Sequence, residues 1–302
     1  MEKIVDMHSH LGNNLYHNGG MIIERKGVKK KIIFDPISIS EFSLHRLKGF
    51  KSILNKWIKN ATRERNKLAT RENMRKSMDE IGATHTVCLP MSLDFVTFSE
   101  LKDASVKDKG IIPFTGIDHT KEYDFNKAFA EDVASGAMGL KLHPIVQCLS
   151  LTDKKTFEAI EAFAVYDLPV LFHCGVMSYF FGKEMKNERP KYGSIVHATK
   201  LVQAFPNVKF IAGHSGLFQV SEAMEIFSSF KNIWTDISFQ SPGTIKKLLN
   251  IFGVDKILSA SDWPFGNRKT AFKALRKACK GDKYVERRTF YENAAELLNM
   301  PF

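Results

Sequence analysis

The chain lacks several features that would each have assigned it to a class of protein. It has four cysteines, and no two of them form a CxxC pair, which excludes a disulfide scaffold and argues against a zinc knot. No apolar run approaches the roughly 18 residues that span a bilayer. The GxGxxG and P-loop motifs are absent, so a nucleotide cofactor is not indicated. The N-terminal residues contain no signal-peptide core, and we therefore expect a cytoplasmic protein that does not contact a membrane.

The excess of basic residues is confined to one segment. The 302 residues include 44 Lys and Arg against 33 Asp and Glu, a net charge of +11. Residues 21–76 hold 16 basic and 5 acidic residues, and the rest of the chain holds 28 of each sign. A uniformly basic protein would have indicated nucleic acid as its partner. Because the remainder is neutral, the charge needs a local explanation.

Short apolar runs alternate with segments of helical periodicity. Near-continuous apolar runs are typical of strands covered on both faces, and strand–helix alternation implies parallel strands with right-handed crossovers. Eight such units predict one α/β domain over residues 1–302, a (β/α)8 TIM barrel, with a doubly wound sheet as the competing fold. The expected strands are Ile4–His8, Thr86–Pro90, Ile111–Ile117, Met138–Leu142, Val170–His173, Val208–Ala212, Ile233–Ile237 and Lys256–Ala260. The expected helices are Arg71–Ile81, Phe125–Ala134, Thr156–Val165, Ile195–Phe205, Ser221–Phe230, Thr244–Ile251, Thr270–Cys279 and Val285–Asn299.

A long basic insertion, residues 11–69, separates the first strand from the first of these helices. Loops at such positions usually have about two to six residues. MIIERKGVKKKIIF, at residues 21–34, predicts two short strands around a turn at Lys26 and Gly27. A helix is expected over Ser40–Arg65. Its apolar stripe must be covered, by the barrel or by the second subunit of a homodimer, and consists of Leu47, Phe50, Leu54, Trp57, Ile58 and Ala61.

Ionisable residues follow the apolar strands. His8 and His10 close the first strand, and alternate side chains of a strand share a face. Neutral imidazole is a common ligand of zinc-like ions, although one HxH pair is weak evidence. The same pattern recurs at the ends of the fourth, fifth, sixth and eighth strands, with Lys141, His143, His173, His214 and Asp262.

The carboxyl ends of barrel strands converge at one mouth, where active sites lie. Buried polar groups are costly unless they are paired or coordinate a metal. We therefore expect the strand-end residues to form a metal site. The other five histidines have no such placement and are expected to be structural or surface residues: His17, His45, His85, His119 and His197.

The motifs DMHSH, GLKLHP, PVLFHCG, AGHSG, SDWPFG and YENAAELL, in this order, resemble the amidohydrolase superfamily of metal-dependent enzymes. GLKLHP, SDWPFG and YENAAELL are most similar to its amidohydrolase-related family, which includes aminocarboxymuconate-semialdehyde decarboxylase and lactone hydrolases. The resemblance covers nearly the whole chain except the insertion, and it implies a (β/α)8 barrel. It implies that one divalent metal, for which Zn is expected, is bound by His8, His10, His173 and Asp262.

The resemblance also assigns roles to two further residues. His214 is implied to be a catalytic histidine near the metal site. In family members with two metals, a carboxylated lysine at the place of Lys141 bridges them, and the histidine at the place of His214 becomes a ligand. One metal or two therefore stays open.

The ligand set predicts a mechanism. A metal with an open position lowers the pKa of bound water toward about 7 and polarises a carbonyl. Asp262 is expected to act as general base, and His214 to orient the water or protonate the leaving group. The predicted activity is hydrolysis of an amide, lactone or other ester of a small, anionic compound. Lys141 and His143 are expected to bind the substrate, although Lys141 could equally pair with Asp262.

Three other functions compete with hydrolysis. A non-oxidative decarboxylase would use the same ligands on a small carboxylic acid. Related deoxyribonucleases share the first-strand HxH but carry an acidic ligand where this chain has Lys141, so we do not expect nucleic acid as a partner. A non-catalytic scaffold is disfavoured by the intact ligand set.

The insertion begins at the same mouth as the predicted metal site, directly after His10. We expect it to form a lid or wall over the mouth. Its basic residues, among them Lys29, Lys30 and Lys31, would then attract an anionic substrate. A basic outer face that is merely solvated is the alternative.

Overall fold

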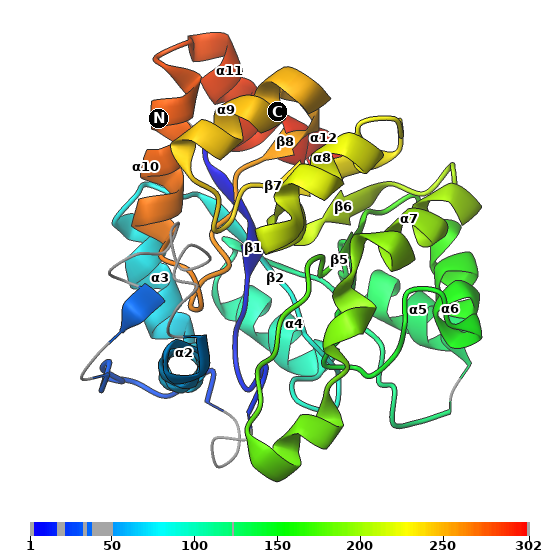
Figure 1. The fold of residues 1–302 in the computed structure, drawn as a ribbon. Helices are drawn as coiled ribbons and strands as arrows, with labels where there is room; N and C mark the ends of the chain where they lie inside the picture. The colour runs from blue at the N-terminus through cyan, green and yellow to red at the C-terminus, as the bar shows by residue number, and fades with distance from the viewer. Residues whose placement is uncertain (1–2, 17–21, 33–34, 38–50, 123, 301–302) are drawn as a thin grey trace.

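The computed structural model describes residues 3–16, 22–32, 35–37, 51–122 and 124–300. They form parallel strands surrounded by helices (Figure 1). Each strand overlaps the apolar run predicted for it, and all are largely buried. The strands are β1 (Val5–Ser9), β2 (His85–Cys88), β3 (Ile111–Pro113), β4 (Leu140–Leu142), β5 (Val170–Phe172), β6 (Phe210–Ala212), β7 (Ile233–Asp236) and β8 (Ile257–Leu258).

The strands close into a barrel at two seams. The ladders run β1-β2-β3 and β4-β5-β6-β7-β8, with every pairing parallel. Bridges between Thr115 and Leu140 and between Ser9 and Trp263 join the two ladders. The backbone N–H of Met7 also donates to the carbonyl of Ser259 at 2.9 Å. The predicted (β/α)8 TIM barrel is therefore confirmed.

Helices follow the strands as predicted, with one addition. The sequence had indicated all of those around the barrel except α4 (Phe98–Lys107), which a capping box of Thr97 and Glu100 begins. The last predicted helix is one run of helical turns, Lys283–Leu297, that includes π-helical residues 288–292. The others are α3 (Arg71–Asp79), α5 (Phe125–Ala134), α6 (Lys154–Ala164), α7 (Ile195–Ala204), α8 (Val220–Phe227), α9 (Pro242–Phe252) and α10 (Arg268–Cys279), and the run itself contains α11 (Lys283–Arg287) and α12 (Asn293–Leu297).

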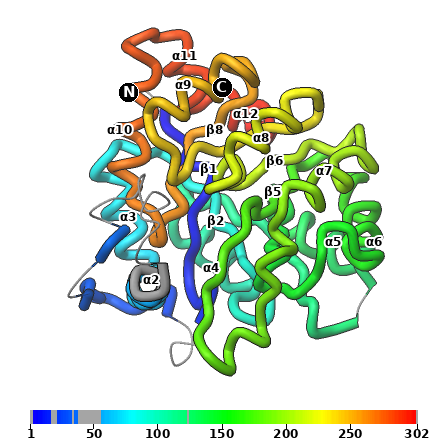
Figure 2. Tube along the Cα trace, viewed as in Figure 1, coloured from blue at the N-terminus to red at the C-terminus, as the bar shows by residue number. Residues whose placement is uncertain are grey.

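Apolar side chains fill the barrel and the layer outside it. One buried cluster joins residues of six strands with α12, and it includes Met7, Leu171 and Leu298. Two larger clusters lie between the strands and the surrounding helices. The first and the last described residues lie at one end of the barrel, where Lys3 donates to the Tyr291 hydroxyl at 3.1 Å. α2 (Lys51–Asn66) lies toward the other end (Figure 2). None of the described helices combines the length and the apolar character needed to cross a bilayer.

A register shift in β1 separates Asp6 from His8. Strict alternation would place both on one face, but the pairing with β2 shifts between Asp6 and Ser9. Asp6 accepts from Arg268 Nε of α10 at 2.7 Å, whereas His8 lines the cavity described below. The shift therefore lets one short strand bind a surrounding helix and also supply the site.

The hairpin predicted for residues 21–34 is wrong for the part that the structure describes. Residues 22–32 contain no strand. Their backbone bonds to α3 instead: the Ile23 carbonyl accepts from the Arg71 N–H at 2.8 Å, and the Gly27 N–H donates to Glu72 at 2.7 Å. Polar groups at the N-terminus of α3 thus replace the partner that a second strand would have provided.

The helix expected over Ser40–Arg65 is observed as α2, and residues 38–50 lie outside the described residues. Within the predicted stripe, Ile58 and Ala61 are buried, but Trp57 is 46% exposed. Leu47 and Phe50 lie outside the described residues. The prediction that Trp57 lies on the covered face is therefore wrong.

Candidate metal centre

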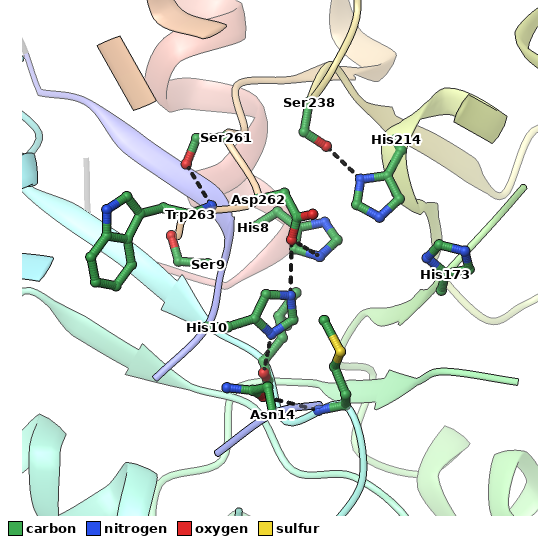
Figure 3. A network of polar contacts seen from close by, with 12 residues as sticks. His8, Ser9, His10, Asn14, His173, His214, Ser238, Ser261, Asp262 and Trp263 are labelled. Carbon is green, nitrogen blue, oxygen red and sulfur yellow. Dashed lines mark hydrogen bonds and ion pairs between the residues drawn. The ribbon is translucent and has the colours of Figure 1, made fainter. Parts of the chain in front are cut away.

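The barrel brings all the predicted site residues to one cavity of ≈ 170 Å³. β1 and β4 carry part of the set, and the segments directly after β1, β4, β5, β6 and β8 carry the rest. Figure 3 shows His8, His10, His173, His214 and Asp262 gathered at this point. The predicted residues that line the cavity are His8, His10, Lys141, His143, His173, His214 and Asp262.

The hydrogen bonds of His8 and His10 fix where each ring keeps its lone pair. His8 Nδ1 lies 2.7 Å from Asp236 Oδ2, and His10 Nδ1 lies 2.6 Å from the carbonyl oxygen of Leu89. A carboxylate and a carbonyl can only accept, so both Nδ1 atoms donate. Each neutral ring therefore keeps its lone pair on Nε2, the atom that a metal binds.

These two Nε2 atoms converge on Asp262. His10 Nε2 lies 3.0 Å from Asp262 Oδ1, and His8 Nε2 lies 3.4 Å from the same oxygen. Despite the 3.0 Å separation, both His10 Nε2 and Asp262 Oδ1 are buried without a hydrogen-bond partner of acceptable geometry in the described part of the chain. Lone pairs held so close repel unless a cation lies between them. A divalent metal satisfies both atoms, so the donor set fits such an ion.

His214 presents a lone pair in the same way. Its Nδ1 lies 2.7 Å from Ser238 Oγ, and the Ser238 hydroxyl donates to Asp236 Oδ1. Because the single hydroxyl proton is used there, Ser238 accepts from His214 Nδ1. The Nε2 lone pair of His214 is left for the cavity. Asp236 thus orients His8 directly and His214 through Ser238.

His173 is placed at the edge of this group. Its Nε2 lies 3.0 Å from the Gly175 carbonyl oxygen, so Nε2 carries the proton and Nδ1 keeps the lone pair. Its ring centroid lies 5.1 Å from that of His214 and 4.3 Å from that of His143. The close groups of ligand atoms are His8–His10–Asp262 and His8–His214–Asp236, and neither includes His173.

Burial keeps the imidazoles of His8, His173 and His214 in the neutral form that binds metals. Burial, followed by the charge of Lys141, lowers the pKa of His8 well below its usual value. The pKa of His214 is lowered likewise by burial and by His8, and burial lowers that of His173 to about 3. The pKa of the Asp262 carboxyl is raised by burial. Uncharged imidazoles beside one acid form a site ready to accept a cation.

Lys141 is fully buried beside the ligand cluster. Its Nζ lies 3.3 Å from His8 Nε2. Burial lowers the pKa of Lys141 to about 8, and the charges of Asp262 and Asp236 oppose this shift. Among the described residues that line the cavity, Lys141 is the only Lys or Arg. A carboxylate in the cavity would find its counter-charge there.

Two of the catalytic candidates have left-handed backbone conformations. The φ angles of His214 and Asp262 are both 57°. Non-glycine residues adopt the left-handed conformation only at a cost in free energy, and residues that do so are concentrated at functional sites. Backbone bonds hold Asp262 in place, since its N–H donates to the His8 carbonyl and its own carbonyl accepts from Gly266, both at 2.8 Å.

The sequence analysis missed three residues of the site. Asp236 and Ser238 orient the imidazoles, and Tyr179 lines the cavity. A signal for Asp236 was present, since it closes β7 as His173 follows β5. Ser238 and Tyr179 lie in loops without any comparable pattern.

Part of the insertion contacts the site, but through two apolar residues and a threonine rather than through charged groups. Its described cavity-lining residues are Ile37, Ile58 and Thr62. Arg65 fixes α2 in place, donating to the carbonyl oxygens of Pro264 and Phe265 at 3.0 Å.

Two cations among the described residues of the insertion form ion pairs away from the cavity lining. Arg65 Nη2 also pairs with buried Asp35 at 2.8 Å, and Lys30 pairs with the same carboxylate. Neither Lys29, Lys30 nor Lys31 lines the cavity. Their predicted attraction of an anionic substrate stays a prediction.

The sequence was compared with known protein families and with curated proteins. The sequence profile of a family described as amidohydrolase matches residues 58–300. No curated protein matches the chain in sequence.

Solved structures are similar over nearly the full length. A probable 2-pyrone-4,6-dicarboxylic acid hydrolase from Acinetobacter baumannii, with citric acid bound, is 15% identical, with 99% and 100% of the two chains covered and a TM-score of 0.63. 5-Carboxyvanillate decarboxylase from Sphingomonas paucimobilis is 13% identical, with complete coverage of both chains and a TM-score of 0.65. The Novosphingobium aromaticivorans 5-carboxyvanillate decarboxylase, complexed with manganese and a nitrobenzoic acid, is 12% identical, with 99% and 96% covered and a TM-score of 0.66. At these identities the likeness establishes the shared fold.

Proposed function

The chain belongs to the amidohydrolase family, and on that premise we propose that it is a metal-dependent hydrolase of a small, anionic carbonyl compound. The bond cleaved is an amide, a lactone or another ester. One observation carries the proposal: the hydrogen bonds of His8 and His10 direct both Nε2 lone pairs toward a buried, unsatisfied oxygen of Asp262. A structural histidine pair needs no such arrangement, whereas a metal site does.

The proposed ligands of the ion are His8, His10, His173 and Asp262. A bound divalent ion supplies an activated water and polarises the carbonyl that is attacked. We propose Zn²⁺, and the manganese in a structural neighbour makes Mn²⁺ the second ion to test. Lys141, if carboxylated, and His214 would complete a two-metal site.

Asp262 and His214 carry the proton transfers in this proposal. The Asp262 carboxylate accepts the proton of the attacking water. His214 Nε2 has a lone pair and a ring held by Ser238, so it can orient the water. Once protonated, the same atom can donate to the leaving group.

The substrate is proposed to be anchored through a carboxylate. Lys141 supplies the counter-charge, and the cavity is otherwise walled largely by apolar side chains. The insertion, residues 11–69, is proposed to act as a wall of the mouth, supported by Ile37, Ile58 and Thr62 in the cavity lining. Excluding water there would strengthen the attraction between Lys141 and a carboxylate.

Decarboxylation of a small carboxylic acid is the second candidate. Two of the structural neighbours are decarboxylases, and a buried lysine beside the ligand cluster suits a substrate carboxylate in either reaction. The ligands themselves do not distinguish the two reactions, because both use the same metal site.

Product analysis separates these candidates. Protein loaded with Zn²⁺ or Mn²⁺ is incubated in ¹⁸O-labelled water with a panel of lactones, esters, amides and aromatic carboxylic acids. If the reaction is hydrolysis, the released acid carries one ¹⁸O atom and no CO2 forms. The Asp262→Asn variant serves as the control and should be inactive. CO2 release without incorporation of ¹⁸O in the organic product would replace the hydrolase with the decarboxylase.

A further inference from the structure

Two proton donors in the cavity differ from the metal-facing histidines. We propose that His143 Nε2–H and the Tyr179 hydroxyl together bind a carboxylate or carbonyl oxygen of the substrate. The inference rests on the proposed function, since it concerns the same cavity. In this proposal, His143 and Tyr179 orient the substrate, and the other histidines of the cavity bind the metal.

The proton of His143 is located by a backbone contact. The Val146 N–H lies 3.3 Å from His143 Nδ1, and a backbone N–H can only donate. His143 Nδ1 is therefore the acceptor, and the neutral ring carries its proton on Nε2. His8, His10 and His214 have the opposite arrangement, with the lone pair on Nε2. His143 thus offers the cavity a proton where they offer a lone pair.

That proton has no acceptor in the described part of the chain. His143 is 1% exposed, and its Nε2 is buried without a hydrogen-bond partner there. The ring cannot easily turn away, because it stacks on His173 at 4.3 Å with an interplanar angle of 12°. The backbone is held as well, since the His143 N–H donates to Gln147 Oε1 at 2.8 Å. A buried donor without an acceptor is costly, so a ligand atom or a water must complete it.

The Tyr179 proton is also available to a ligand. Its hydroxyl oxygen lies 3.5 Å from His173 Nε2. Because His173 Nε2 already carries a proton and donates to the Gly175 carbonyl, it cannot accept the proton of Tyr179. The hydroxyl can accept only a long, shared bond from His173. Its own proton is therefore left for a ligand atom or a water to accept.

Tyr179 is held rigidly beside His143. Its N–H donates to Glu188 Oε2 at 2.6 Å, and its carbonyl accepts from the Tyr16 hydroxyl at 2.9 Å. Its ring packs edge-on against His143, with centroids 5.5 Å apart. Both side chains line the cavity that contains Asp262. These two fixed, neutral groups can each donate a hydrogen bond to the same oxygen atom. A carboxylate or carbonyl oxygen has the two lone pairs that this requires.

Binding measurements test the pair without requiring turnover. Metal-loaded protein is titrated calorimetrically with benzoate and, in parallel, with nitrobenzene, which has a similar shape but is a much weaker acceptor. Tyr179→Phe removes only the hydroxyl and is expected to weaken benzoate binding roughly tenfold. Nitrobenzene binding should change little. Tyr192→Phe removes a hydroxyl outside the cavity lining and serves as the matched control.

Variants of His143 provide the second arm. His143→Phe keeps a ring to stack on His173 but loses the N–H, and a benzoate loss of about tenfold is expected. His143→Gln restores an N–H donor near the Nε2 position and should recover most of that loss. Both variants should retain the metal content of the wild type.

Several results would overturn the inference. They are unchanged benzoate affinity in Tyr179→Phe and His143→Phe, equal losses for benzoate and nitrobenzene, no saturable benzoate binding to metal-loaded wild type, or loss of metal in His143→Phe. The first would mean that water completes the donors, and the last would make His143 a ligand. A wild-type protein that binds no metal would instead contradict the proposed function, so the two failures are distinguishable.

Discussion

At the scale of the residue, the position of each proton determines what the site can bind. The rings of His8, His10 and His214 each donate through Nδ1, to Asp236, Leu89 and Ser238 respectively. Their sequence positions predicted that they would meet, but not which nitrogen would face the cavity. Two of the relevant acceptors, on Leu89 and Gly175, are backbone carbonyls, which no residue type reveals. That these residues line one cavity was therefore predictable, and their tautomers were not.

Asp236 is the residue on which this orientation depends most. It accepts from His8 Nδ1 and from the Ser238 hydroxyl that holds His214. We predict that Asp236→Asn lowers metal affinity roughly 10–100-fold, because such outer carboxylates fix the ligand ring and raise its basicity. Competition with a fluorescent chelator measures this. Asp167→Asn, an exposed acid, is the matched control, and equal affinities of the two variants would remove Asp236 from the site.

At the scale of the element, the β1 register shift joins the site to the surrounding layer. Arg268 of α10 is buried, and its guanidinium donates to Asp6 and Ser9 of β1, both at 2.7 Å. It also donates to Thr86 of β2 at 3.1 Å. One side chain thus connects α10 to the first two strands, and one of its bonds is to Ser9, the residue after His8.

Loss of this guanidinium should destabilise the fold. Arg268→Met leaves the Asp6 carboxylate buried without its counter-charge, and we expect the free energy of unfolding to fall by about 3–5 kcal/mol. Urea unfolding followed by tryptophan fluorescence measures the change. Lys269, the exposed residue next to Arg268, provides the control. Lys269→Met should change the free energy of unfolding by no more than about 0.5 kcal/mol. A similar small effect in both variants would contradict the role assigned to the buried pair.

The strands and most helices were predictable because each is an apolar run or stripe that only burial explains. Two predictions failed in different ways. α4 was missed although Phe98, Leu101 and Ala104 recur at helical spacing and the capping box at Thr97 marks its start. The hairpin of residues 21–34 was wrong because its backbone bonds to α3, a partner far along the chain that local patterns do not contain.

At the scale of the whole molecule, the segment that carries the net charge of +11 also contributes residues to the lining of the cavity. The described contacts show that its buried cation, Arg65, fixes α2 to the loop after β8, whereas Ile37 and Ile58 line the cavity. Composition predicted a basic segment near the mouth. It did not predict that the described residues of the insertion at the cavity are uncharged. The charges of Arg65 and Lys30 are used in ion pairs with Asp35, which composition alone does not reveal.

The central claim is that the barrel mouth is a metal site, and metal analysis tests it most directly. The purified chain is stripped with a chelator, reloaded separately with Zn²⁺ and Mn²⁺, passed through gel filtration and analysed by plasma mass spectrometry. We predict one or two ions per chain for the wild type and little retained metal in Asp262→Ala and His10→Ala. Less than one ion per chain in the wild type, or the same content in the variants, would contradict the account.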